Sequence, residues 1–127
     1  MTAANTPRPP LARALGAGLL SRLLTGVAAN LAHVVVSRPR GLYFVELAPA
    51  RVFAATVALN LLGGAVYWAL AGGATARRSF ALVAAAAAAA LSLAALALPL
   101  RGFFATVLVV HGVVALGAAL VIPRAAR

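Results

Sequence analysis

Long apolar stretches separated by arginines dominate the pattern of this chain. Residues 52–76, 79–100 and 102–123 carry no formal charge and are 25, 22 and 22 residues long. A helix needs about 20 residues to cross a hydrocarbon core of roughly 30 Å. The pattern therefore predicts three membrane-spanning helices, at about 51–72, 79–98 and 103–122.

A fourth apolar stretch lies near the N-terminus and is interrupted by Arg22. Either a helix over about 15–37 spans the membrane, with Arg22 snorkelling back to the headgroups on the N-terminal side, or residues 11–21 lie flat on the membrane surface. We favour the span. A cleaved signal peptide competes with it, but Arg22 splits the apolar run and no convincing small-x-small cleavage site follows.

The connections between these four stretches are short. Backbone groups in lipid must be hydrogen-bonded within the chain, so the spans are expected to be helices, and short connections make neighbouring helices antiparallel. The predicted fold is all-α, an up-down four-helix transmembrane bundle. It comprises one membrane domain over 15–123, an N-terminal tail over 1–14 and a C-terminal tail over 124–127.

Composition agrees with this class of protein. Hydrophobic residues make up 65% of the chain and charged residues 9%, whereas a typical soluble domain is roughly 25% charged. Eleven arginines and no lysine oppose the single acid Glu46, but they lie singly or in pairs and form no continuous basic face, which argues against nucleic acid as a partner. There is no cysteine, which excludes disulfides and thiolate chemistry.

Arginine bias predicts the orientation in a cell membrane. Four arginines fall on the side opposite the N-terminus: Arg38, Arg40, Arg51 and Arg101. Six fall on the N-terminal side: Arg8, Arg13, Arg77, Arg78, Arg124 and Arg127. The positive-inside rule then places both termini in the cytoplasm.

Five polar residues at membrane depth form the candidate site: Asn30, His33, Asn60, Ser92 and His111. Counted at about 1.5 Å per residue, Asn30 and Asn60 lie roughly 10 to 13 Å from the non-cytoplasmic surface, Ser92 about 9 Å and His111 about 12 Å. Four antiparallel helices would thus bring polar groups to one layer. The favoured interpretation is that this layer fixes helix register through interhelical hydrogen bonds.

Two functional interpretations of the same layer stay open. A histidine can gain and lose a proton near neutrality, so His111, with His33, could relay protons along a translocation path. The layer could also bind a lipid or a small ligand. No cofactor is expected. Two histidines supply at most half of a tetrahedral metal site, and no serine has a neighbouring base with an orienting acid, so the sequence predicts neither a metal site nor an enzyme.

Four segments carry a resemblance to a known family. They are LTGVAANLAH, WALAGGATARRSF, LSLAALALPL and the histidine-bearing last helix that ends VIPRAAR. Over roughly residues 14–127 the chain resembles a bacterial domain of unknown function, an uncharacterised family of small four-helix integral membrane proteins. The matching positions are Asn30, Ser92 and His111. In VVHGVV a glycine follows the histidine, whereas the family often has leucine or methionine around it. The resemblance implies the fold and no activity.

The sequence thus predicts a small integral membrane protein in contact with the lipid bilayer. It favours a structural or interaction protein that acts through helix contacts, as a homo-oligomer or with another membrane protein. A small transporter or proton-coupled carrier is the alternative. However, four-helix multidrug exporters use a glutamate in the first helix, where this chain has Asn30 and His33. An accessory subunit of a larger membrane complex is a third possibility.

Overall fold

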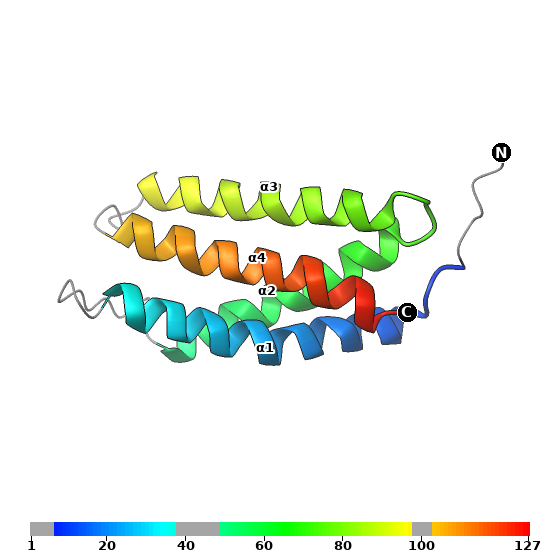
Figure 1. The fold of residues 1–127 in the computed structure, drawn as a ribbon, viewed down its shortest axis with the longest axis horizontal. Coiled ribbons are helices and arrows are strands. Elements are labelled where there is room, and N and C mark those ends of the chain that lie inside the picture. The colour runs from blue at the N-terminus through cyan, green and yellow to red at the C-terminus, as the bar shows by residue number, and fades with distance from the viewer. Residues whose placement is uncertain (1–6, 38–48, 98–102) are drawn as a thin grey trace.

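Four long helices form the protein in a computed structural model that describes residues 7–37, 49–97 and 103–127. They are α1 (Leu11–Ser37), α2 (Pro49–Leu70), α3 (Ala76–Ala97) and α4 (Phe104–Ala125). Each contains a stretch long and apolar enough to cross a membrane. The predicted all-α four-helix bundle is confirmed, with α1 beginning and α4 ending at the same end of the bundle (Figure 1).

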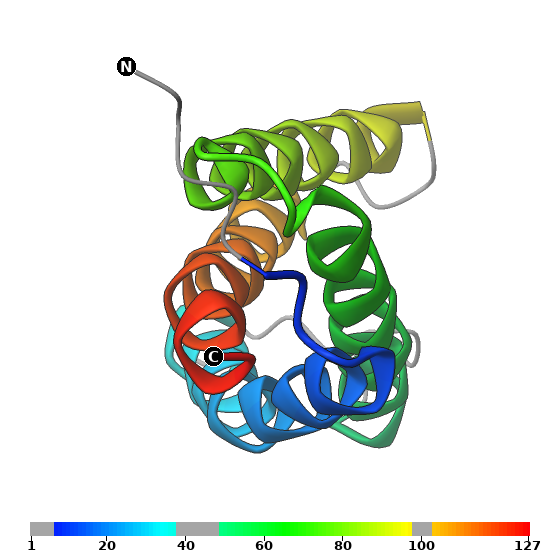
Figure 2. The ribbon, with the colours of Figure 1, turned by 90° about the vertical axis from the view of Figure 1, so that its right-hand side faces the viewer.

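The helices are arranged around the bundle in the order α2, α1, α4, α3 (Figure 2). Helix α1 packs extensively against both α2 and α4, and α3 packs against α4. Helices α2 and α3 are joined by the short turn at residues 71–75 and then diverge, so that α2 makes few contacts with either α3 or α4. The bundle is therefore open along the side between α2 and the α3–α4 pair.

Two glycines bring the backbones of α1 and α2 into direct contact. A Cβ atom added at Gly64 would lie 2.6 Å from the carbonyl oxygen of Ala14, and one added at Gly18 would overlap the carbonyl oxygen of Asn60. Small residues at such positions let transmembrane helices approach closely, because association in lipid depends on packing and hydrogen bonds. Glycine is therefore required at both positions.

The largest cluster of buried apolar residues lies at the end of the bundle where α1 begins. It joins Ala14 and Ala17 of α1 to Tyr67 of α2, Phe80 of α3 and Ile122 of α4. The rings of Tyr67 and Phe80 meet edge to face, with centroids 5.4 Å apart. This cluster ties all four helices together at one end.

The outer surface carries many large apolar side chains. The exposed fraction reaches 61% at Leu31, 61% at Leu62, 63% at Leu82 and 63% at Leu116, one on each helix. A bundle that buries small residues and exposes leucine fits the hydrocarbon core of a bilayer. The protein is a multi-pass membrane protein in contact with lipid.

Helices α1, α2 and α3 begin earlier than the sequence predicted, and the difference is largest for α1 and α3. Helix α1 begins at Leu11 rather than near residue 15, because the amides of Arg13 and Ala14 donate to the carbonyl of Pro10 at 3.0 and 3.1 Å. Residues 11–21 belong to this continuous helix. Helix α3 begins at Ala76 rather than near residue 79, which places Arg77 and Arg78 in its first turn.

Candidate functional site

Asn60 links α2 to α1 inside the bundle. Its side chain is fully buried, and its amide donates to the Thr25 hydroxyl at 3.2 Å and to the carbonyl of Thr56, in its own helix, at 2.8 Å. The Thr25 hydroxyl in turn donates to the carbonyl of Ser21 at 2.9 Å. Since that donation uses its one proton, Thr25 acts as the acceptor for Asn60.

Ser92 and His111 form the corresponding link between α3 and α4. The Ser92 hydroxyl donates to the carbonyl of Ala88 at 2.7 Å, and it lies 3.0 Å from Nδ1 of His111. Having given its one proton to Ala88, the hydroxyl can only accept from the imidazole. The neutral His111 therefore carries its proton on Nδ1 and leaves Nε2 as a hydrogen-bond acceptor.

Both links are built in the same way. In each, a hydroxyl donates to the carbonyl four residues earlier in its own helix and accepts from a side chain of the neighbouring helix. A hydroxyl used in this way leaves no donor unpaired in the apolar interior. Each link thus contributes one interhelical hydrogen bond, from α2 to α1 in the first and from α4 to α3 in the second.

The predicted polar layer is brought together only in part. Ser92 and His111 are partners, whereas Asn60 pairs with Thr25. The amide of Asn30 donates to the carbonyl of Gly26 in its own helix at 2.8 Å. His33 lies half-buried on the same helix. Among the described residues, no group of three or more histidine or acidic side chains comes together as a metal site would require.

Arg22 differs from its expected position. Its guanidinium carbon lies 4.3 Å from the ring centroid of Phe53, in the second turn of α2 at the end opposite the start of α1. The expectation that this side chain snorkels back to the N-terminal headgroups is therefore wrong. The positive charge is attracted to the negative face of the aromatic ring, which is a stronger interaction where water is excluded.

Sequence reasoning missed two buried hydroxyl groups. Ser21 and Thr25 are each at most 3% exposed. Neither stands out in the sequence, because a serine or threonine in a transmembrane helix can bond to its own backbone on any face. The position of Thr25 opposite Asn60 would have revealed the Thr25 hydroxyl, but that position can be recognised only once α1 and α2 are known to pair.

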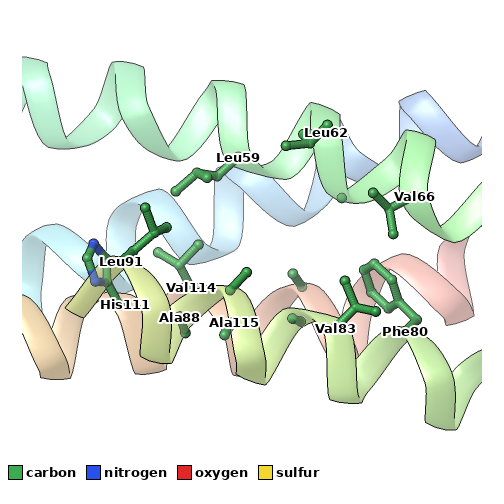
Figure 3. Close-up of a pocket in the computed structure, with 14 residues that line it drawn as sticks. Leu59, Leu62, Val66, Phe80, Val83, Ala88, Leu91, His111, Val114 and Ala115 are labelled. Atoms are coloured by element: carbon green, nitrogen blue, oxygen red, sulfur yellow. The ribbon is translucent and has the colours of Figure 1, made fainter. Parts of the chain in front are cut away.

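An apolar cleft of about 140 Å³ lies between α2 and the α3–α4 pair. Its walls include Leu59 and Leu62 of α2, Phe80 and Leu91 of α3, and His111 of α4 (Figure 3). The imidazole lies at one end of the cleft, beyond the row of aliphatic side chains (Figure 3). This cleft follows from the divergence of α2 and α3, and His111 supplies its polar end.

Comparisons with protein-family models, curated proteins and solved structures find no match to this chain. The four long apolar helices indicate a small multi-pass membrane protein, and no family is identified.

Proposed function

We propose that this membrane protein is a structural or interaction protein rather than an enzyme, and that it acts through helix contacts with a second copy of itself. The observation that carries the proposal is an outward-facing groove between α3 and α4 that is lined mostly by small residues and contains a glycine, Gly112, that the packing of the bundle does not require. The resemblance to an uncharacterised bacterial family of four-helix membrane proteins is compatible with this function and adds no activity.

The buried polar groups support a structural role for the interior. A hydrogen bond joins Asn60 to Thr25 across one helix interface, and another joins Ser92 to His111 across a second interface. Such bonds contribute about 0.6 kcal/mol on average in a membrane bundle, which is enough to favour one helix register over another. The two links therefore support a structural role for Asn60, Ser92 and His111.

Gly112 marks the groove on the outer face of α3 and α4. A Cβ atom added at Gly112 would meet nothing within 4 Å, so the bundle itself does not require glycine there. Glycine inside a helix costs about 1 kcal/mol relative to alanine. On α4, Leu108 and Leu116 flank Gly112 in the groove, while most of the other lining residues are small, including Ala81, Ala85 and Ala89 of α3 and Ala119 of α4. A groove of this composition suits the close approach of another transmembrane helix.

A second copy is the partner that the groove fits. Ala81, Ala85 and Ala89 recur every four residues on α3, so they form one stripe along that helix. This stripe is exposed and also forms one wall of the groove. In a two-fold dimer the same surface patch of both copies forms the contact, so the patch must be complementary to itself. The α3 stripe of each copy can pack in the groove of the other copy.

Gly112→Leu tests this proposal, with Gly16→Leu as the matched control. Both glycines are exposed and helical, and a Cβ atom at either would meet nothing within 4 Å, but only Gly112 borders the groove. Förster transfer between donor- and acceptor-labelled copies in liposomes measures association. We expect Gly112→Leu to weaken association about five- to 150-fold, because overpacking costs about 1 to 3 kcal/mol, and Gly16→Leu to leave it unchanged. Equal transfer in both variants would refute the proposal.

The proposal includes a topology with both termini in the cytoplasm. It is supported by the collection of Arg8, Arg13, Arg77, Arg78 and Arg127 around one end of the bundle, where α1 begins and α4 ends.

A proton-coupled carrier is the second candidate, and the half-buried imidazole of His111 beside the cleft favours it. In proteoliposomes, a carrier would show substrate-dependent proton movement that disappears in His111→Ala. Unchanged proton movement in that variant would refute the carrier function. An accessory subunit of a larger complex would instead co-purify with other membrane proteins from native membranes.

A further inference from the structure

A basic concavity of about 910 Å³ lies at the end of the bundle where α1 begins and α4 ends. We refer to it as the basic bowl. It is bordered by the segment 7–10, by residues 73–76 at the start of α3, and by Ala126 and Arg127, which follow α4. Figure 2 looks onto this end and shows the segment 7–10 crossing it between the helices. The bowl is on another part of the molecule from both the α3–α4 groove and the His111 cleft.

Positive charge surrounds the bowl. Five arginines border it: Arg8, Arg13, Arg77, Arg78 and Arg127. Helices α1 and α3 both begin at its edge, and neither has an acidic residue in its first turn. The N-terminus of a helix carries a partial positive charge and unpaired amide groups, so both helices add to the attraction for an anion.

Tyr67 supplies a polar group among these lining residues. Its side chain is only 7% exposed, and it is held by edge-to-face packing against Phe80. Tyr67 nevertheless lines the bowl. Within the described part of the chain its hydroxyl forms no hydrogen bond, and it is not among the buried polar atoms that lack a partner, so it is open to the bowl. The hydroxyl can therefore donate its proton to an acceptor that enters the bowl.

Arg8 fixes the rim of the bowl against α2. Its guanidinium carbon lies 5.0 Å from the ring centroid of Trp68, and its Nη2 donates to the carbonyl of Ala69 at 3.3 Å. Tryptophan near the end of a transmembrane helix lies typically at the level of the lipid headgroups. The bowl is therefore at the depth where a phospholipid carries its phosphate.

We infer that the basic bowl binds a phosphate group, and that its source is the headgroup of an anionic phospholipid. Arginine guanidinium groups pair with phosphate oxygens through two parallel N–H donors, and the Tyr67 hydroxyl donates to a further oxygen. Basic pockets between transmembrane helices bind phospholipid headgroups in this way. A soluble phosphate would use the same donors, and the experiment separates the two sources.

The full chain in detergent is titrated with phosphatidylglycerol, and the bound lipid is counted by native mass spectrometry. Phosphatidylcholine is the neutral comparison, and inorganic phosphate is the soluble competitor. The variants are Arg78→Gln, Arg13→Gln and Tyr67→Phe. Arg124→Gln is the matched control, because Arg124 is exposed near the same end of α4 but does not line the bowl.

Phosphatidylglycerol should bind more tightly than phosphatidylcholine. Loss of Arg78 or Arg13 should weaken it about fivefold, the effect of roughly 1 kcal/mol per basic residue near an anionic surface. Tyr67→Phe should weaken it about tenfold, as loss of a hydrogen bond to a charged group does, while Arg124→Gln leaves it unchanged. Tyr67→Phe keeps the ring that packs on Phe80, and thermal melting of each variant checks the fold. If Tyr67→Phe lowers the melting temperature, the arginine variants alone test the inference.

Three results would overturn the inference in whole or in part. If Arg124→Gln weakens binding as much as Arg78→Gln, the lipid is attracted by the overall positive charge of this end of the protein, and the bowl is not a binding site. Equal affinity for phosphatidylcholine would also overturn it. If inorganic phosphate displaces the lipid and its own binding depends on Arg78 and Tyr67, the phosphate site is supported and the lipid headgroup as its source is refuted.

Discussion

Gly64→Ala tests how closely α1 and α2 approach each other. The added Cβ atom would lie 2.6 Å from the carbonyl oxygen of Ala14 and 3.3 Å from Cα of Leu15, both backbone atoms of α1 that cannot rotate away. Restoring the ordinary contact distance of 3.4 Å requires the helices to separate by about 0.8 Å at this point. The structure therefore predicts a loss of stability from a single methyl group.

The size of that loss can be worked out from three contributions. Overpacking costs about 1 to 3 kcal/mol. The hydrogen bond between Asn60 and Thr25, already 3.2 Å long, would stretch beyond bonding range in a rigid separation and forfeit about 0.6 kcal/mol. Alanine is a better helix former than glycine by about 1 kcal/mol, which offsets part of the cost. We expect a net destabilisation of about 1 to 2 kcal/mol.

Unfolding in SDS, followed by helical circular dichroism and by the fluorescence of the single tryptophan Trp68, measures this change. Gly16→Ala is the control, because its Cβ atom would meet nothing within 4 Å and only the gain in helix propensity applies. Gly64→Ala should unfold at a lower SDS fraction than the native chain, and Gly16→Ala at the same or a higher one. If the two variants unfold together, the close contact of α1 and α2 is refuted.

Three further predictions concern the polar links and the topology. Thr25→Val removes the acceptor of Asn60 and should lower the unfolding free energy in SDS by about 0.6 kcal/mol; no change would show that the link contributes nothing. In the native chain, ¹⁵N NMR of His111 should show the proton on Nδ1, and Ser92→Ala should shift the population toward Nε2–H; an Nε2–H imidazole in the native chain would contradict the assigned hydrogen bond. A reporter fused to the C-terminus should be active in the cytoplasm, and a periplasmic signal would overturn the arginine argument.

The helical architecture could be predicted from the sequence because charge and hydropathy alone determine where a chain can cross a bilayer. The residues at which the helices begin and end were predicted less accurately, since helix ends depend on local geometry. Helix α1 begins at Leu11 because the carbonyl of Pro10 accepts two amides, a detail that hydropathy does not encode. The predicted depth of His111 and Ser92 was useful, because these two residues do meet.

The faces of the helices could not be predicted in the same way. Where nearly every residue of a helix is apolar, its periodicity does not reveal which side is buried, so residues at equal depth can face different partners. Asn30 and Asn60 illustrate this point, since one bonds to its own helix and the other reaches Thr25 across the interface. Arg22 was misplaced for a related reason, because its aromatic partner Phe53 is known only once α1 and α2 are paired.

Cysteine cross-linking in native membranes tests the central claim, that the chain functions through contact of its α3–α4 face with a second copy. The chain contains no cysteine, so a single one reports on its own position. Ala85 is exposed and lines the groove, and Ala28 is an exposed alanine of α1 that does not line it. Oxidation should cross-link Ala85→Cys into a dimer and leave Ala28→Cys monomeric. A monomeric Ala85→Cys, or equal cross-linking of both variants, would contradict the proposed function.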